Sequence, residues 1–239
     1  MTVDEPAGGR RYDGSGRAEQ AHRHACHPSY GVRRIIDRGP GDQGSQEERG
    51  PVGHRDRCRK KPGRGLAALA VLTLFAQPSV PDVEAHLMAQ DVLLVGGGSV
   101  VNLMAVWRAH GLAPVMRGCW EAGVVLAGWS AGSLCWHRGG PTDSFGDSLA
   151  VFTDGLGLLP YSNGVHDSLG GQPRRRVYRE YVASSELPAG YATEDGVGLH
   201  YIGTELHEAV AMRDGAQAWW VEPSPDGGYH DEPIPPRRL

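Results

Sequence analysis

The segment that most constrains the fold is an apolar run that ends in a turn of small residues, at positions 124–137 (VVLAGWSAGSLCWH). Four apolar residues lead into Gly128-Trp129-Ser130-Ala131-Gly132, and a helix-compatible stretch follows. Between a strand and a helix, this Gly-x-Ser-x-Gly pattern is typical of a sharp turn that strains its middle residue and needs small neighbours. The pattern predicts that Ser130 is a nucleophile beside a helix N-terminus, which favours developing negative charge. A turn with a purely structural role is the alternative.

Composition divides the chain into a basic leader and an acidic body. Residues 1–65 contain 12 glycines and carry 14 Lys and Arg against 9 acidic residues, a net charge of +5. The remainder carries 10 basic and 19 acidic residues, a net charge of −9. We therefore predict a disordered leader at 1–65, with a nucleic-acid-binding tail as the alternative reading, a catalytic domain at 66–222 and a C-terminal tail at 223–239. The acidic body argues against nucleic acid as the main partner.

The sequence predicts neither a membrane span nor a disulfide framework. No stretch reaches the roughly 18 uninterrupted apolar residues that a membrane helix needs. The four cysteines have no C-x-x-C spacing; they are Cys26, Cys58, Cys119 and Cys135. A reduced, cytoplasmic protein is the expectation. His22, His24 and His27 lie beside Cys26 at loosely metal-like spacing, but no second cluster follows, so we expect no metal and no cofactor.

Strand and helix patterns alternate from residue 66 onwards. Residues 66–75 read as a buried strand, a helix starts near Pro81, and 92–95 form a short strand before Gly96-Gly97-Gly98. Ser99 can cap the next helix. Further elements are expected at 114–122 (helix), 124–128 (strand), 175–184 (helix) and 197–202, 206–212 and 217–222 (strands). This alternation predicts an α/β fold with a mostly parallel sheet flanked by helices.

A serine nucleophile needs a base, and the base needs an orienting acid. His137 lies two helical turns beyond Ser130, about 10 Å away by helix rise, which is too far for it to reach the hydroxyl. His166 follows an apolar segment in a polar loop, where such sheets place catalytic groups, so it is the best candidate base. Spacing leaves the acid open among five loop residues: Asp143, Asp154, Asp167, Glu194 and Asp195.

The three glycines at 96–98 have two readings. Backbone N–H groups in such a turn, at a helix N-terminus, can stabilise an oxyanion, or they can cradle a phosphate. The segment lacks both the G-x-G-x-x-G spacing and the lysine of a P-loop, because the chain's lysines are Lys60 and Lys61. Oxyanion stabilisation is therefore the favoured reading.

Leu94-Val95-Gly96-Gly97-Gly98-Ser99, followed by the Gly-Trp-Ser-Ala-Gly turn, resembles peptidase E, the aspartyl dipeptidase family. The similarity continues through Pro141-Thr142-Asp143, Leu158-Leu159-Pro160 with His166, and Thr193-Glu194-Asp195-Gly196, and so covers about residues 70–222. It implies a class I glutamine-amidotransferase-like fold with flavodoxin-like layering. The family's first βαβ unit has no counterpart in residues 1–65.

The resemblance also implies a role for each matched residue. Ser130 would be the nucleophile, His166 the general base and Asp195 the acid that orients it. Asp143 matches a second acid linked to activity, and the amides of Gly98 and Ala131 would stabilise the oxyanion. A serine here, in place of the cysteine of amidotransferases, favours peptidase chemistry.

The expected function is that of a serine peptidase that hydrolyses short peptides, as a dipeptidase does, through an acyl-enzyme. Small peptides are the expected partners, with no nucleic acid and no membrane. One alternative is an esterase or another amidohydrolase with the same turn. The other is a non-catalytic amidotransferase-like domain with an incomplete N-terminus. Asn163-Gly164-Val165-His166 departs from the family's proline–histidine pair, which puts aspartyl specificity in question.

Overall fold

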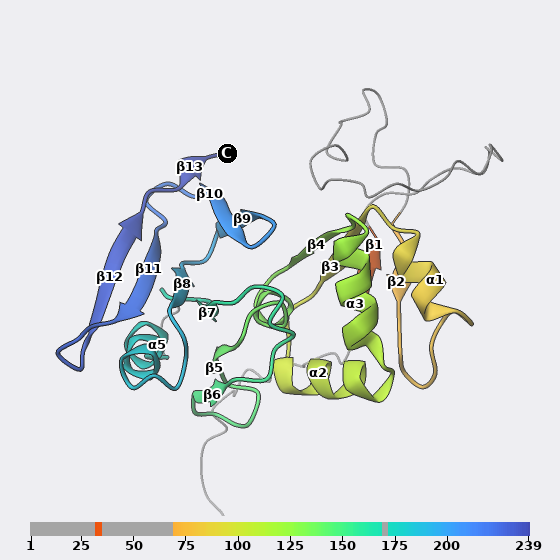
Figure 1. The fold of residues 1–239 in the computed structure, drawn as a ribbon, viewed down its shortest axis with the longest axis horizontal. Coiled ribbons are helices and arrows are strands. Elements are labelled where there is room, and N and C mark those ends of the chain that lie inside the picture. The colour runs from red at the N-terminus through yellow and green to blue at the C-terminus, as the bar shows by residue number, and fades with distance from the viewer. Residues whose placement is uncertain (1–31, 35–68, 169–171) are drawn as a thin grey trace, which may run out of the picture.

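Figure 1 shows the protein as a computed structural model, which describes residues 32–34, 69–168 and 172–239. These residues form a mixed α/β structure with several small sheets. The predicted disordered leader lies outside the described residues, apart from Val32–Arg34. Those three residues form strand β1, which pairs antiparallel with two strands of the body, so the leader is not entirely without regular structure.

The first sheet has the order β2 (Val71–Leu72), β1, β3 (Val92–Val95), β4 (Val125–Gly128). β3 and β4 are parallel, with Val92 opposite Val125 and Val95 opposite Gly128. Their carboxyl ends therefore lie at the same edge of the sheet, which places the three-glycine loop next to the serine turn. The predicted buried strand at 66–75 is wrong over most of its described length. Only β2 is a strand there, and Leu69 and Phe75 are 60% and 62% exposed.

Three helices pack with this sheet around one apolar core: α1 (Val83–Met88), α2 (Val100–Ala109) and α3 (Leu112–Glu121). Each of these three helices was predicted, and the expected cap is confirmed because the Ser99 hydroxyl accepts a hydrogen bond from the Asn102 N–H. Asp82 caps α1 in the same way. The largest fully buried side chains of this core belong to α1, α2, α3 and β3; they include Trp107, Leu87, Leu93, Met104 and Met116.

Beyond the serine turn the chain forms smaller elements. Helix α4 (Ala131–Leu134) is followed by the antiparallel pair β5 (Gly140–Thr142) and β6 (Ala150–Phe152). A second four-stranded sheet has the order β12 (Tyr229–Ile234), β11 (Ala218–Pro223), β8 (Gly190–Thr193), β7 (Ser162–Gly164), and helix α5 (Arg174–Ala183) packs on it. A third sheet has the order β13 (Arg237–Arg238), β10 (Glu205–Ala211), β9 (Val197–Ile202).

The α/β class is confirmed, but a mostly parallel sheet is not found among the described residues. Parallel pairing joins β3 to β4, β7 to β8 and β10 to β13, and the other pairs are antiparallel. Short connections account for some of the antiparallel pairs. Parallel strands need a long crossover, whereas β9 and β10 are joined by Gly203 and Thr204 alone, a length that allows only a hairpin.

The segment 223–239, read from the sequence as a tail, carries regular structure. β12 pairs along its whole length with β11, and β13 pairs with β10. The Leu239 N–H also donates to the carbonyl of Ala211. Over the described ranges, no helix combines the length and the apolar character that crossing a bilayer requires.

Candidate active site

The turn that carries Ser130 has the strained backbone that its sequence predicts. Ser130 has φ 54° and ψ −120°, a conformation that residues with a side chain rarely adopt. The flanking glycines allow it. A Cβ on Gly128 would lie 2.1 Å from the carbonyl oxygen of Gly132, and one on Gly132 would lie 2.2 Å from that of Val95. Because these contacts are with backbone, no side-chain rotation can relieve them, and the positions require glycine.

His166 lies between Ser130 and Asp195, within hydrogen-bonding distance of each. His166 Nε2 is 3.0 Å from Ser130 Oγ, and His166 Nδ1 is 2.5 Å from Asp195 Oδ1. A carboxylate accepts only, so Nδ1 carries the proton and Nε2 is left to accept from the serine hydroxyl. His166 also has a positive φ, 59°, the kind of backbone strain that clusters at functional sites. The predicted nucleophile, base and acid are thus brought together.

Sheet register explains why the base and the acid meet. β7 and β8 are parallel, with Gly164 opposite Ala192, so the residues that follow them lie at the same edge. The Asp167 N–H donates to the Thr193 carbonyl at 3.0 Å and continues this pairing. The serine turn is joined to the same edge through α4, because the Ser133 hydroxyl donates to the Asn163 side chain at 3.0 Å.

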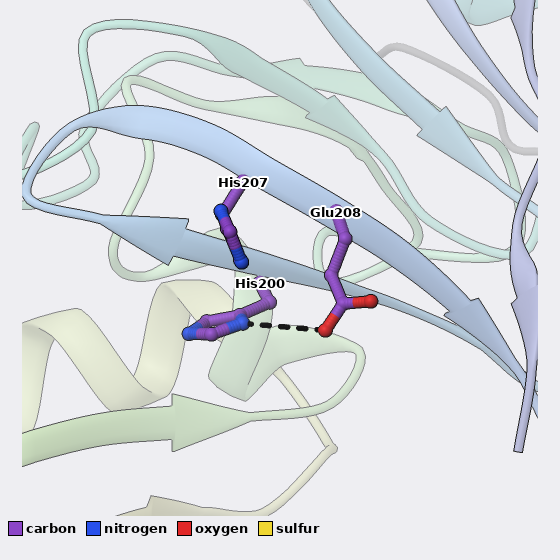
Figure 2. A group of neighbouring side chains, drawn as sticks. All are labelled: His200, His207 and Glu208. Atoms are coloured by element: carbon purple, nitrogen blue, oxygen red, sulfur yellow. Dashed lines mark ion pairs between the residues drawn. The ribbon is translucent and has the colours of Figure 1, made fainter.

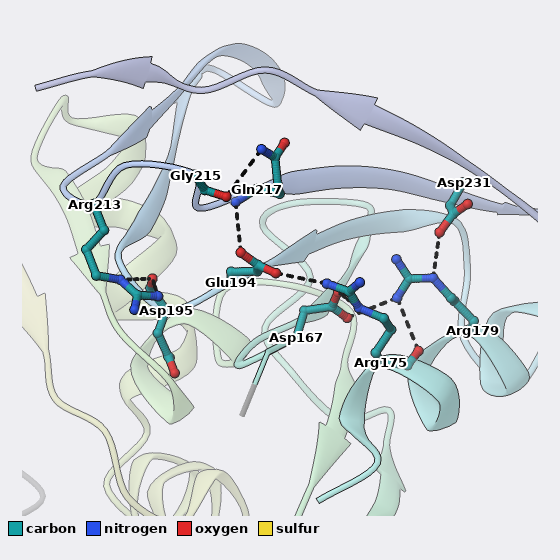
Figure 3. Close-up of polar contacts among 9 residues, drawn as sticks. All are labelled: Asp167, Arg175, Arg179, Glu194, Asp195, Arg213, Gly215, Gln217 and Asp231. Carbon is teal, nitrogen blue, oxygen red and sulfur yellow. Dashed lines mark hydrogen bonds and ion pairs between the residues drawn. The ribbon is translucent and has the colours of Figure 1, made fainter. Parts of the chain in front are cut away.

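The loop after β7 and the loop after β8 are held together by a charged network (Figure 3). It consists of Asp167, Arg175, Arg179 and Glu194. The Asp167 carboxylate, 1% exposed, accepts from Arg175 Nε and Arg179 Nη1, each at 2.9 Å. Arg175 Nη2 donates to Glu194 at 2.9 Å, and the other Glu194 oxygen accepts from the Gln217 N–H at 3.1 Å. Arg175 therefore links the residue after His166 to the residue before Asp195.

Two further arginine contacts complete the arrangement. The backbone carbonyl of Asp195 accepts from both Nε and Nη2 of Arg213, and Arg179 Nε donates to Asp231 at 2.7 Å (Figure 3). Burial raises the pKa of Asp167 above its ordinary value, although Arg179 and Arg175 oppose the shift. Burial lowers the pKa of Arg179, but the hydrogen bond to Asp231 and the charge of Asp167 outweigh it and raise that pKa overall.

Asp143 lies apart from the three aligned residues. Its Oδ2 accepts from Arg174 Nη2 at 2.9 Å and from Gln172 Nε2 at 3.3 Å. Burial would raise the pKa of Asp143, but the hydrogen bond from Gln172 and the charge of Arg174 outweigh it, so the pKa lies below its ordinary value. No contact within the described ranges joins Asp143 to His166, so Asp143 is not part of the hydrogen-bonded series Ser130–His166–Asp195.

The predicted oxyanion donors are Gly98, in the three-glycine loop, and Ala131, which directly follows Ser130. Ala131 is the first residue of α4, and Gly98 precedes the Ser99 cap of α2 with φ 135°. Neither backbone N–H is used in a hydrogen bond within the described part of the chain. A Cβ on Gly97 would lie 3.2 Å from the Ser130 Cβ, which shows how closely the glycine loop approaches the turn.

His137 does not lie on a helix two turns from the serine. α4 ends at Leu134, and His137 is buried, with Nδ1 bonded to the Ser133 carbonyl at 2.8 Å. Burial lowers the pKa of His137 to about 4. A neutral, enclosed histidine of this kind has a structural role.

The sequence suggested Arg174–Arg176 as possible partners of a substrate carboxylate, but the contacts of Arg175, Arg179 and Arg213 with the site loops were not predicted. One signal was present: Arg175 and Arg179 are four residues apart and so share a helix face, and Asp167 directly follows His166. A cavity of about 910 Å³ lies beside the network, lined by Asp167, Arg175, Arg179, Glu194, Tyr229 and Asp231 among others. None of the three aligned residues lines it, so their hydrogen-bonded geometry, rather than this cavity, marks the candidate site.

Comparison with known proteins adds a family and several relatives. Residues 64–209 match peptidase family S51. The chain is 40% identical over 150 residues to the uncharacterized peptidase YgaJ of Bacillus subtilis (strain 168), a match that covers 63% of this chain and 64% of that protein. It is 28% identical over 160 residues to peptidase E of Pasteurella multocida (strain Pm70), a match that covers 63% of this chain and 67% of that protein. Peptidase E of Shigella flexneri is 26% identical over 184 residues, a match that covers 67% of this chain and 79% of that protein. The chain thus spans just under two thirds of the length of the Bacillus relative.

Proposed function

The chain belongs to peptidase family S51, and on that premise we propose that it is a serine-type peptidase that hydrolyses short peptides through an acyl-enzyme. The observation that carries the proposal is the hydrogen-bonded chain from Ser130 through His166 to Asp195. These are the groups that serine acyl transfer needs, a nucleophile, a base and an orienting acid, in the order that the reaction needs them.

The proposed reaction uses one proton relay twice. Ser130 Oγ attacks the peptide carbonyl while His166 Nε2 takes its proton, and the carbonyl oxygen becomes negatively charged. The N–H groups of Gly98 and Ala131 would donate to that oxygen. His166 then returns the proton to the departing amine and leaves an ester on Ser130. A water molecule, activated by the same nitrogen, hydrolyses the ester.

Asp195 has two tasks in this proposal. It keeps the His166 proton on Nδ1, so that Nε2 faces the serine as a base, and it stabilises the imidazolium that forms during each step. The charged network and Arg213 position it, because they hold both the Glu194 side chain and the Asp195 carbonyl. Asp143, paired with Arg174, would act outside this relay.

Membership of the family also bears on the fold and on the cellular compartment. We propose that residues 66–222 form the catalytic unit of a class I glutamine-amidotransferase-like fold with flavodoxin-like layering. Short peptides suit an open site, since the side chains of His166 and Asp195 are 30% and 43% exposed. Cys119 and Cys135 are unpaired and buried, which fits a reducing, cytoplasmic setting.

The test combines covalent labelling with a dipeptide-library assay on the purified protein. A fluorophosphonate probe should label Ser130, and Ser130→Ala should lose both labelling and peptide hydrolysis, by about 10³-fold or more. Ser148→Ala is the matched control, because Ser148 is an exposed serine that bonds to none of the three aligned residues, and it should keep full activity. Hydrolysis of esters without any peptide cleavage would show an esterase, and an unlabelled protein would show a non-catalytic domain.

The neighbouring acids provide a second test. Asp195→Asn should lower kcat far more than Glu194→Gln, because only Asp195 touches His166. An amide at 195 stabilises the wrong imidazole tautomer, a change that costs about 10⁴-fold in a serine protease triad. A larger loss in Glu194→Gln than in Asp195→Asn would contradict the assignment of the acid.

A further inference from the structure

Three metal-ligating side chains gather on the β9–β10 hairpin: His200, His207 and Glu208 (Figure 2). His200 lies on β9 directly opposite Glu208 on β10. The register shifts between Leu206 and Glu208, so the β10 strand has an extra residue at His207. A bulge of this kind sets two residues of one strand against one of the other, which re-aims a side chain. It thereby adds His207 to the cross-strand pair of His200 and Glu208.

The donor atoms are already close to one another. One donor from each of the three side chains lies within 4.8 Å of the other two, and His200 Nδ1 is 3.7 Å from Glu208 Oε1. The two imidazole rings have centroids 5.1 Å apart at an interplanar angle of 83°. Zinc bonds to nitrogen and oxygen ligands are about 2.0–2.2 Å long, so a tetrahedral site needs donors about 3.5 Å apart. The side chain of His200 is 55% exposed, and rotation of exposed side chains can supply this contraction without moving the strands.

We propose that His200, His207 and Glu208 bind a divalent transition-metal ion of the Zn²⁺ class. Two imidazoles and one carboxylate are a donor set that suits zinc and its neighbours in the first transition row, and does not suit the oxygen-preferring Mg²⁺ or Ca²⁺. Three protein ligands leave the fourth position to water. The site cross-links the two strands of the hairpin that begins directly after Asp195-Gly196, so its first role is structural.

Arg237 on β13 sets the strength of this site. Its Nε donates to Glu208 Oε2 at 2.8 Å and its Nη2 to Oε1 at 3.1 Å. One guanidinium thus engages both oxygens of the Glu208 carboxylate. The guanidinium also places a positive charge beside the bound cation, which weakens binding. Removal of that charge should therefore tighten the site.

Equilibrium dialysis of the full-length protein against ZnCl₂ tests the proposal. His200→Ala and His207→Ala should each weaken binding of one Zn²⁺ equivalent by at least about 10-fold, because even outer-shell partners of a metal change affinity by 10- to 100-fold. Arg237→Gln should strengthen it. His230→Ala is the matched control, because His230 is an exposed histidine that faces one carboxylate, Glu222, at 3.8 Å, and it should bind as wild type.

The leader needs its own control, since His22, His24, Cys26 and His27 could bind zinc independently. Their joint replacement by alanine should leave the hairpin equivalent intact. Loss of that equivalent in the leader variant, with His200→Ala and His207→Ala unchanged, would overturn the proposal.

A measurement on the unmodified protein guards against misfolded variants. In NMR spectra of the histidine rings, Zn²⁺ should shift His200 and His207 and leave His230 in place. Shifts confined to other histidines, or no saturable shift at all, would also overturn it.

Discussion

Gly132→Ala and Gly118→Ala should change stability in opposite directions, although the chemical change is the same. A Cβ on Gly132 would lie 2.2 Å from the carbonyl oxygen of Val95 and 2.8 Å from that of Gly96, well below the 3.4 Å at which ordinary contact begins. The missing distance of about 1 Å can come only from moving α4 away from β3. Overpacking costs about 1–3 kcal/mol, and the upper end applies here because every opposing atom is backbone.

Gly118 provides the matched control within helix α3. A Cβ there would have nothing within 4 Å beyond its own helix, and the position carries no positive φ. Alanine at a helix interior is better than glycine by about 0.5–1 kcal/mol, because glycine loses more backbone freedom on folding. Gly118→Ala should therefore stabilise the protein slightly.

Urea denaturation followed by circular dichroism measures both effects. We expect the free energy of unfolding to fall by about 3 kcal/mol in Gly132→Ala, or about 6–12 °C in Tm, and to rise by about 0.5–1 kcal/mol in Gly118→Ala. Two variants that shift in the same direction, or a Gly132→Ala protein as stable as wild type, would refute the close backbone approach at the serine turn.

Two predictions concern buried charge. The folded-state pKa of His137 is about 4, below its unfolded value of about 6.5, so between these pH values only the unfolded chain takes up the proton. Stability should therefore fall by about 2 kcal/mol from pH 7 to pH 5 through this residue, and urea denaturation at both pH values should show the fall disappear in His137→Gln. Arg179→Met should lower the free energy of unfolding by about 3 kcal/mol, because it leaves the buried Asp167 with one partner. Arg176→Met, at an exposed pair with Glu180, should change it by less than about 0.5 kcal/mol; equal effects of the two changes in urea would contradict the buried pairing.

The sequence predicted best where local chemistry decides the backbone. The strand at 197–202 agrees with the structure at both ends, and the helix at 175–184 agrees within one residue, because apolar spacing sets both. The strand β12 was missed because Tyr229–Ile234 has no apolar alternation. It pairs at the edge of its sheet and is mostly exposed, and an edge strand tolerates Pro233. The stretch at 66–75 misled in the opposite way, since Leu69, Val71 and Phe75 are exposed and only Leu72 and Leu74 of its large apolar side chains are described as buried.

The site was predictable to different depths at different residues. Ser130 follows from its own neighbours, because the glycines two positions before and after it dictate the turn. His166 needed the further argument that loops at strand ends carry catalytic groups. Spacing could not select Asp195 from Glu194, since the choice depends on which side of the chain each faces, and only the resemblance to a family separated them. The arginine contacts depend on how α5 packs on the second sheet, which no local pattern encodes.

In each of the two loops of the site, adjacent residues make different contacts. His166 faces the serine while Asp167 enters the charged network, and Asp195 faces the histidine while Glu194 enters that network. Insertion or deletion of one residue ahead of either pair would exchange the two roles, as a one-residue slip does in a strand. Loops ordinarily accept changes in length during evolution, but these two cannot. Length variation is easier to accommodate at turns such as Gly203–Thr204, where no side-chain hydrogen bond is found among the described residues.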